Sequence, residues 1–314
     1  NYVTNLYNNL FDGCTGITSI SLPKTLQSIN GYVFRNCSKL SEIVVPEGVT
    51  TVGEHCFENC TSLTSVSLPT TLKVLENHLF NNCNKLESFV FQPTMDTVEE
   101  HCFDQCLSLK NLRFDDGTST ITLSTVVSMF GDSPLENMYV GRNIDYTLIE
   151  GKEKEAPFYN RSTLTNVTIS DKGGVTYLRP YFIYGASTLP GINVPDNVLE
   201  IGMYAFAECS SLEEAVLSKN LSLIDEGLFD QDIALKSLII PGAVNAVNQY
   251  ALRGCGALQD LRFEDSTNPL TAAIARSNRG MCGDTHLENL YIGRNIRYSA
   301  TKSNGYSPFY NLTS

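Results

Sequence analysis

The sequence predicts a β-rich solenoid, and three observations carry this prediction: a 23-residue repeat, a two-residue apolar alternation within each unit, and a longer period of about 150 residues. Repeats of about 20 to 50 residues are typical of solenoids, in which each unit packs only on its neighbours. We expect an array of about 12 units with short parallel strands, short helical turns and inserted loops.

Phenylalanine recurs every 23 residues in the first part of the chain, at Phe11, Phe34, Phe57, Phe80 and Phe103. A cysteine follows each by three positions, and an aliphatic residue follows by six. This apolar anchor position is assigned farther along the chain to Met129, Phe158, Phe182, Phe206, Phe229, Leu252, Met281 and Phe309. Because the position stays apolar in every unit, we expect its side chains to stack in one continuous core.

An apolar–variable–apolar triplet, such as Val66-Ser67-Leu68, follows each anchor. A two-residue apolar period indicates a short strand with one buried face. Proline closes several triplets, for example at Pro69, and marks the strand end because it cannot donate to a sheet. The segment before each anchor is too short for a long helix, so we expect one helical turn there.

A second period indicates a duplication. The stretch LENMYVGRNI at 135–144 recurs as LENLYIGRNI at 287–296, and PFYN at 157–160 recurs at 308–311. A block of six units has therefore been copied.

We predict a single domain over residues 1–314, made of two related blocks at roughly 11–160 and 161–314. Four units are lengthened by mostly polar insertions, which are predicted to form loops. The insertions lie at about 115–128, 148–156, 264–280 and 297–307.

The pattern Phe-x2-Cys-x2-Leu-x2-Ile-x-Leu-Pro-x2-Val-x2-Ile resembles the BspA-like leucine-rich repeats, over roughly residues 3–314. The GRNI and PFYN blocks are similar to the long units of members from Bacteroidetes. The resemblance implies a curved leucine-rich-repeat solenoid that is secreted or exposed on the cell surface, with binding or adhesion and no catalytic motif. Departures at Met129, Met281 and 188–189 are expected to mark local kinks.

The chain has 314 residues, 22 Lys and Arg against 34 Asp and Glu, and a net charge of −12. This acidic balance argues against nucleic acid as a partner, because phosphate contacts need clustered basic residues. The sequence contains no run of about 18 apolar residues, so we predict that it does not span a membrane. It also lacks the glycine motifs of nucleotide sites, and we predict no cofactor.

The sequence begins at Asn1 without a charged-then-apolar leader, which favours a processed piece of a longer chain. Solenoids normally need polar caps over their end coils. We therefore expect further sequence, a cap or a neighbouring molecule to cover the ends, and an extracellular or outer cell-surface location.

Cysteine and histidine recur in phase with the repeat, and each allows two interpretations. Seven of the ten cysteines share one position, which favours small buried apolar residues over disulfides or metal ligands. His55, His78 and His101 should stack on consecutive coils, with a zinc site as the alternative. Tyr32 and Tyr204 occupy the same position, which favours a structural stack. We predict no metal and no catalytic Cys–His pair.

Candidate ligand-binding residues lie on the side of the strands that faces away from the core. The middle residue of each triplet is mostly neutral, except for two Arg–Tyr pairs on neighbouring units, and the GRNI turns add two further arginines. Arginine and tyrosine are enriched at interface hot spots, whereas a cation–π stack within the chain is the alternative. The candidates are Arg113, Tyr139, Arg262, Tyr291, Arg142 and Arg294.

These observations predict a recognition or adhesion module that binds a host or microbial surface protein or glycan non-covalently, on the strand face and the inserted loops. A structural spacer for another domain of a longer chain is the first alternative. A hydrolase with its site in the inserted loops is the second, and no catalytic residue is assigned.

Overall fold

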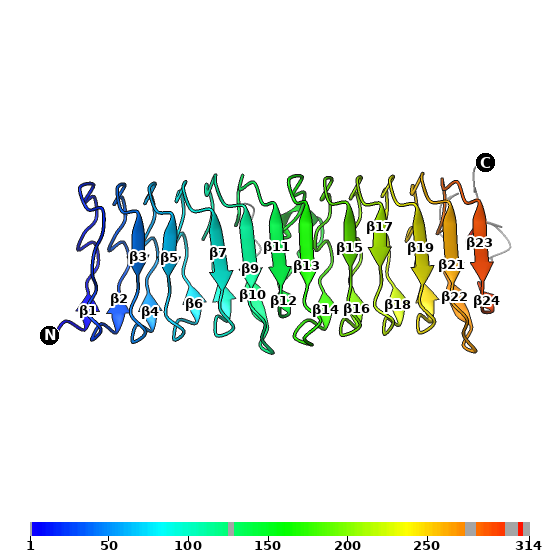
Figure 1. Ribbon diagram of the computed structural model, residues 1–314, viewed down its shortest axis with the longest axis horizontal. Coiled ribbons are helices and arrows are strands. Elements are labelled where there is room, and N and C mark those ends of the chain that lie inside the picture. Colours follow the sequence, from blue (N-terminus) through cyan, green and yellow to red (C-terminus); the bar gives the residue numbers. More distant parts are fainter. Residues whose placement is uncertain (1, 125–128, 274–280, 299–306, 310–314) are drawn as a thin grey trace. The chain divides into compact units, whose positions relative to one another are not determined.

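Short parallel strands, stacked coil upon coil, build both units of the chain (Figure 1). The computed structural model describes residues 2–124, 129–273, 281–298 and 307–309. The two compact units are Asn1–Met138 with Ile144–Pro157, and Tyr139–Asn143 with Phe158–Ser314. The single domain expected from the sequence stays a prediction.

The first unit holds two rows of strands that pair in parallel. One row contains β1 (Asn5–Leu6), β2 (Ser28–Ile29), β4 (Thr51–Val52), β6 (Val74–Leu75), β8 (Thr97–Val98), β10 (Ile121–Leu123) and β12 (Ile144–Asp145). The other row contains β3 (Glu42–Val44), β5 (Ser65–Ser67), β7 (Ser88–Phe91) and β9 (Asn111–Phe114). Strand β11 (Asn137–Val140) lies at the unit boundary.

The second unit repeats this arrangement. One row contains β14 (Tyr177–Leu178), β16 (Glu200–Ile201), β18 (Leu223–Ile224), β20 (Ala246–Val247), β22 (Leu270–Ala272) and β24 (Ile296–Arg297). The other contains β13 (Asn166–Ile169), β15 (Gly191–Asn193), β17 (Glu214–Val216), β19 (Ser237–Ile240), β21 (Asp260–Phe263) and β23 (Asn289–Ile292). We call the outward side of β15, β17, β19, β21 and β23 the front face, and that of β14, β16, β18 and β20 the back face.

The anchor phenylalanines stack through the core of the first unit. Ring centroids lie 5.7 Å apart between Phe34 and Phe57, and 5.5 Å apart between Phe57 and Phe80. These rings are fully buried, as is that of Phe103, which stacks on Phe80 at 5.5 Å. The predicted β-rich solenoid, with a core of recurring apolar side chains, is thus confirmed.

The segment before each anchor forms a turn and not the expected helical turn. His55, two residues before Phe57, has a φ of 55°, and Asn59, two residues after it, has a φ of 60°. A right-handed helix needs negative φ at every residue, so these left-handed residues prevent it. The one helical segment in the described part of the chain is the short 3-10 helix η1 (Glu153–Glu155), which lies in an insertion.

Three anchors lie one residue later than the sequence predicts. The N–H of Phe57 donates to the carbonyl of the residue just before the next anchor, Phe80. By the same hydrogen bond, Phe103 pairs with the Met129 carbonyl and Leu252 with that of Met281, so the next anchors are Phe130 and Cys282. Ile183 donates to the Ala205 carbonyl and replaces Phe182 as the anchor. The apparent shift at 188–189 therefore disappears, because Leu189 follows Ile183 at the regular distance.

Candidate functional site

The front face carries exposed side chains at the middle position of each strand, as the two-residue alternation predicts. In the second unit, Val216 is 58% exposed and Ile239 is 51% exposed on neighbouring strands. On the equivalent side of the first unit, Val44 reaches 67%. Aliphatic side chains on several coils are therefore exposed to solvent, and no part of the described chain covers them.

Arg262 and Tyr291 lie next to these aliphatic residues. Strands β21 and β23 pair in a register that places Arg262 opposite Tyr291. The guanidinium carbon lies 4.1 Å from the ring centroid, so the predicted pair is brought together as a cation–π contact. The ring remains 43% exposed, which leaves part of it open to a partner.

Asp265 fixes the ring of Tyr291 from the side. The Tyr291 hydroxyl donates to Asp265 Oδ1 at 2.7 Å, and this hydrogen bond raises the pKa of the phenol. The sequence analysis assigned no role to this residue. The recurrence of Leu-Arg-Phe followed by two acidic residues, at 112–116 and 261–265, was the available signal that the acid accompanies the arginine.

A hollow of about 620 Å³ lies over these strands. Ile239, Arg262 and Tyr291 form part of its lining, together with the acidic side chains of Asp260 and Glu288. The hollow thus offers apolar, cationic, aromatic and anionic groups within a short stretch of surface, which is the mixture found at protein interfaces.

The other predicted pair falls on the boundary between the units. Arg113 lies in β9 of the first unit, where Nε forms an ion pair with Asp115 Oδ1 at 2.5 Å. Tyr139 lies in β11 and is half-buried in the second unit. A hollow of about 330 Å³, lined in part by Val90 and Asp115, opens beside Arg113.

Arg142 and Arg294 do not lie on the surface as the sequence analysis assumed. Arg142 is fully buried and Arg294 is only 6% exposed. Arg294 donates to the carbonyls of Val244 at 2.6 Å and Pro241 at 2.5 Å, and to those of Gly242 and Ile240. Both terminal nitrogens of its guanidinium thus donate to the backbone two coils earlier, as a buried charge requires, whereas Nε is buried without a partner among the described residues. We therefore assign it a structural role.

The three in-phase histidines form a stack. Ring centroids lie 4.5 Å apart between His55 and His78, and 4.8 Å apart between His78 and His101. Tyr32 continues the stack, 4.7 Å from His55. In the described part of the chain, no group of three or more His, Cys, Asp or Glu residues is placed to hold a metal ion.

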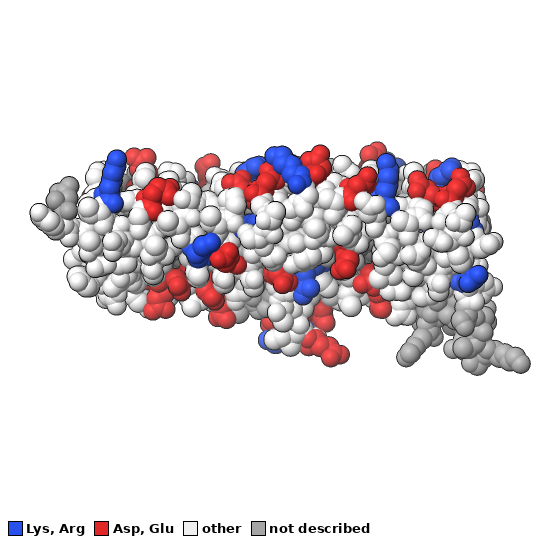
Figure 2. Space-filling view, turned by 90° about the horizontal axis from the view of Figure 1, so that it is seen from below, with Lys and Arg blue, Asp and Glu red and all other residues white. Residues whose placement is uncertain are grey.

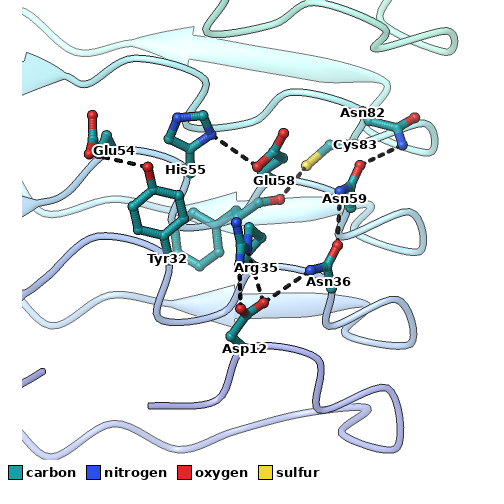
Figure 3. A network of polar contacts seen from close by, with 11 residues as sticks. Asp12, Tyr32, Arg35, Asn36, Glu54, His55, Glu58, Asn59, Asn82 and Cys83 are labelled. Carbon is teal, nitrogen blue, oxygen red and sulfur yellow. Dashed lines mark hydrogen bonds and ion pairs between the residues drawn. The ribbon is translucent and has the colours of Figure 1, made fainter. Parts of the chain in front are cut away.

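A polar ladder runs beside this stack along the turns (Figure 3). Asn82 Nδ2 donates to Asn59 Oδ1 at 2.7 Å, and Asn59 Nδ2 donates to Asn36 Oδ1 at 2.9 Å. Asn36 in turn donates to Asp12 at 3.0 Å, and Arg35 pairs with the same carboxylate at 2.5 Å. The bonds to Arg35 lower the pKa of Asp12. These side chains satisfy one another, so the ladder stabilises the edge of the unit.

The ten cysteines lie within the described residues and all are free thiols. In the regular coils, the thiol donates to the carbonyl of the preceding coil's anchor, as Cys83 does to Phe57 at 3.2 Å (Figure 3). Burial raises the pKa of Cys37 to about 11 and that of Cys106 to about 12. The buried thiols of the regular coils therefore act as small packing groups with a weak hydrogen bond to the backbone, and their raised pKa disfavours the reactive thiolate.

Asp232 occupies the cysteine position of its coil, three residues after the anchor Phe229, and the repeat pattern alone gave no sign that this residue matters. Its Oδ1 accepts the N–H of Cys209 at 2.8 Å, but Oδ2 is buried with no hydrogen-bond partner. Burial raises the pKa of this carboxyl well above its usual range. Burial of this carboxyl thus disfavours its charged form in the folded chain.

Charged side chains of both signs are interspersed on the side of the molecule shown in Figure 2, with neutral surface between them. On the front face, Glu213 and Lys236 form such a pair at 2.5 Å. None of the helices in the described residues is long and apolar enough to cross a membrane.

Comparisons with known proteins identify the repeat. A family model described as "BspA type Leucine rich repeat region" matches residues 4–134 and 154–278. A leucine-rich cell surface protein of Faecalibacterium prausnitzii is 21% identical with a TM-score of 0.44, over 99% of this chain and 87% of its own. A leucine-rich repeat protein of Bacteroides ovatus is 21% identical with a TM-score of 0.45, over 95% and 88% of the two chains. The search of curated proteins gave no match.

Proposed function

Because the chain belongs to the BspA-type leucine-rich repeat family, we propose that it is a recognition or adhesion module at the cell exterior. It binds a surface protein or a glycan non-covalently on its front face. The observation that supports this most directly is the Arg262–Tyr291 contact beside exposed Ile239. Arginine and tyrosine anchors next to apolar surface are typical of binding hot spots.

The composition of the front face favours a protein over a glycan. Val216 and Ile239 gain free energy when another apolar group covers them, at about 25 cal/mol per Å² of buried apolar surface. Sugar hydroxyl groups would instead lose water against these side chains without gaining hydrogen bonds. A protein partner with apolar and basic side chains fits Ile239, Asp260 and Glu288 together.

Arg113 in the first unit and Tyr139 in the second are proposed as two further contacts, each argued within its own unit. Arg142 and Arg294 support the coils behind these regions and are not expected to touch the partner, because their side chains are buried. The inserted loops at about 115–128, 148–156, 264–280 and 297–307 are proposed as flanking contacts; residues 125–128, 274–280 and 299–306 lie outside the described residues.

A protein and glycan array probed with the purified chain tests the proposal. Any hit is then titrated against alanine variants of Arg113, Tyr139, Arg262 and Tyr291. Each substitution at a hot spot should weaken binding by more than about 1 kcal/mol. Thr168→Ala, at the middle position of β13, is the matched control and should leave the affinity unchanged.

If the chain is instead a structural spacer, the expected result of this experiment is the opposite. A spacer gives no array hit, or hits whose affinity is unaffected by all four substitutions. The hydrolase has no residue of the described chain assigned to it, and we propose no catalytic role. Turnover of an array ligand by the purified chain, abolished by a single substitution in an inserted loop, would restore that alternative.

A further inference from the structure

The back face of the second unit carries an apolar patch where other coils are polar. Leu199 is 49% exposed. The residues at the equivalent position of the neighbouring coils are Thr176, whose carbonyl accepts the Leu199 N–H, and then Ser222 and Asn245, which are joined by the same hydrogen bond. Leu223 on the next strand is 36% exposed. An exposed leucine at a position that otherwise holds polar residues is not needed to build a coil.

The hydrogen-bond ladder of the back face is interrupted beside this patch. The N–H groups of Leu199 and Gly202 donate to the preceding coil at 2.8 and 2.9 Å, and those of Asn245 and Asn248 do the same. Between these two steps, β16 and β18 belong to different sheets. No bond joins the N–H groups of Ser222 and Asp225 to the carbonyls of Leu199 and Ile201.

A cavity of about 530 Å³ opens at this interruption. Leu199, Leu223 and Tyr177 line it together with Ser222. Its walls also carry Arg179, Glu200 and Asp225, so the charge of the lining is negative by one. No hydrogen-bond partner of the Glu200 carboxylate is found among the described residues.

We propose that this cavity binds a short extended peptide segment of a partner protein, with an apolar side chain next to a basic one. Unused backbone N–H and C=O groups on facing walls call for a ligand that offers both donors and acceptors, as a peptide bond does. Leu199 and Leu223 accommodate the apolar side chain. Glu200 and Asp225 attract the basic side chain.

The first unit contains a matched interruption that lacks one of the two apolar side chains and one of the two acids. Strands β4 and β6 also belong to different sheets. By strand register, Thr50 and Thr51 there match Leu199 and Glu200. Val74 and Glu76 match Leu223 and Asp225. The interruption by itself therefore gives no binding site in our proposal. Leu199 and Glu200 distinguish the cavity of the second unit.

NMR spectroscopy of the ¹⁵N-labelled chain tests the site with N-acetyl-leucyl-lysine amide as the probe. The amide resonances of Ser222 and Asp225 should shift and saturate at millimolar probe. N-acetyl-leucyl-glutamate amide should bind about threefold more weakly, because its charge is repelled. Leu199→Thr, which installs the residue type of the neighbouring coil, should weaken binding about tenfold by loss of apolar contact.

Two controls separate binding from damage to the fold. Val74→Thr, at the matched gap of the first unit, should leave the Ser222 and Asp225 shifts unchanged. Arg262→Ala on the front face should also leave them unchanged, so failure of the proposed front-face function does not affect this test. Shifts that grow linearly without saturation, or that survive both Leu199→Thr and Leu223→Thr in folded protein, would overturn the proposal.

Discussion

The imidazole of His78 is stacked on that of His55 at 4.5 Å, in the middle of a row of rings. Its Nδ1 is buried without a hydrogen-bond partner, whereas His55 Nδ1 contacts Glu58 at 2.9 Å and His101 Nδ1 lies 3.9 Å from Asp104. Three residues after His78, where the other two coils have Glu58 and Asp104, the chain has the neutral residue Asn81. His78 is thus the one ring of the three without an acid beside it.

Stability of the first unit should therefore fall as the solution is acidified. Burial, and then the neighbouring imidazoles, lower the pKa of His78 below its ordinary value near 6.5. A histidine with a lowered pKa binds its proton more readily when unfolded, so its contribution to stability is present above about pH 6.5 and is lost as the pH falls. Urea unfolding between pH 5 and pH 8 measures this slope.

The matched variant is His78→Tyr, because tyrosine occupies the same left-handed position at Tyr32 and Tyr204. It should keep the stack and flatten the pH dependence below pH 6.5. His286→Gln, outside the stack, should leave the slope as it is in the natural chain. An equal slope in the His78 variant would show that the stacked imidazole does not sense pH.

Asp232 should reduce stability at neutral pH. A buried acid whose pKa is raised stabilises the folded state only at low pH, and that contribution is lost as the pH rises through the raised pKa. Asp232→Cys restores the residue of this position and lets a thiol donate to the Phe206 carbonyl, as Cys255 does to Phe229. We expect a gain of about 1 to 2 kcal/mol at pH 7 in urea unfolding.

The gain from Asp232→Cys should shrink as the pH is lowered toward 4, where the aspartic acid is neutral in both states. Asp230→Cys is the opposing control: its carboxylate pairs with Arg253, and its loss should destabilise the unit. A destabilised Asp232→Cys chain would mean that the Cys209 N–H depends on the carboxylate.

Thiol labelling should separate Cys14 from the other cysteines. Cys14 is partly exposed and the remaining nine are buried. Burial raises the pKa of Cys56 to about 12, and thiolates are the species that react. Iodoacetamide at pH 8 should label Cys14 alone in folded protein, and all ten after denaturation, by mass spectrometry. Early labelling of Cys60 or Cys83 would indicate a loosely packed core.

The sequence was sufficient to predict the core of the regular coils, since a fixed 23-residue spacing leaves one way to stack Phe34, Phe57 and Phe80. The sequence was insufficient to identify Phe130 as an anchor, because Leu135 follows Met129 by the regular six residues. Residue spacing alone therefore does not reveal that the turn is one residue shorter here. The hydrogen bond from Phe103 to the Met129 carbonyl reveals it.

The candidate site shows a similar limit. The alternation of faces located Arg262 and Tyr291, because it depends only on residue parity along a strand. It gave no information on Arg294, whose partners lie about 50 residues earlier in the chain. Nor did it indicate the gap between β16 and β18, because the presence or absence of a backbone hydrogen bond does not determine which amino acids occupy the strands.

Arg294→Met should destabilise the second unit without altering partner binding at the front face. Methionine fills a similar volume but leaves the carbonyls of Val244 and Pro241 buried without their charged donor. We expect a loss of about 3 kcal/mol in urea unfolding. Arg262→Met, which removes an exposed arginine, should cost less than about 1 kcal/mol. Equal losses in the two variants would mean that Arg294 does not hold the backbone of the coil at 240–244.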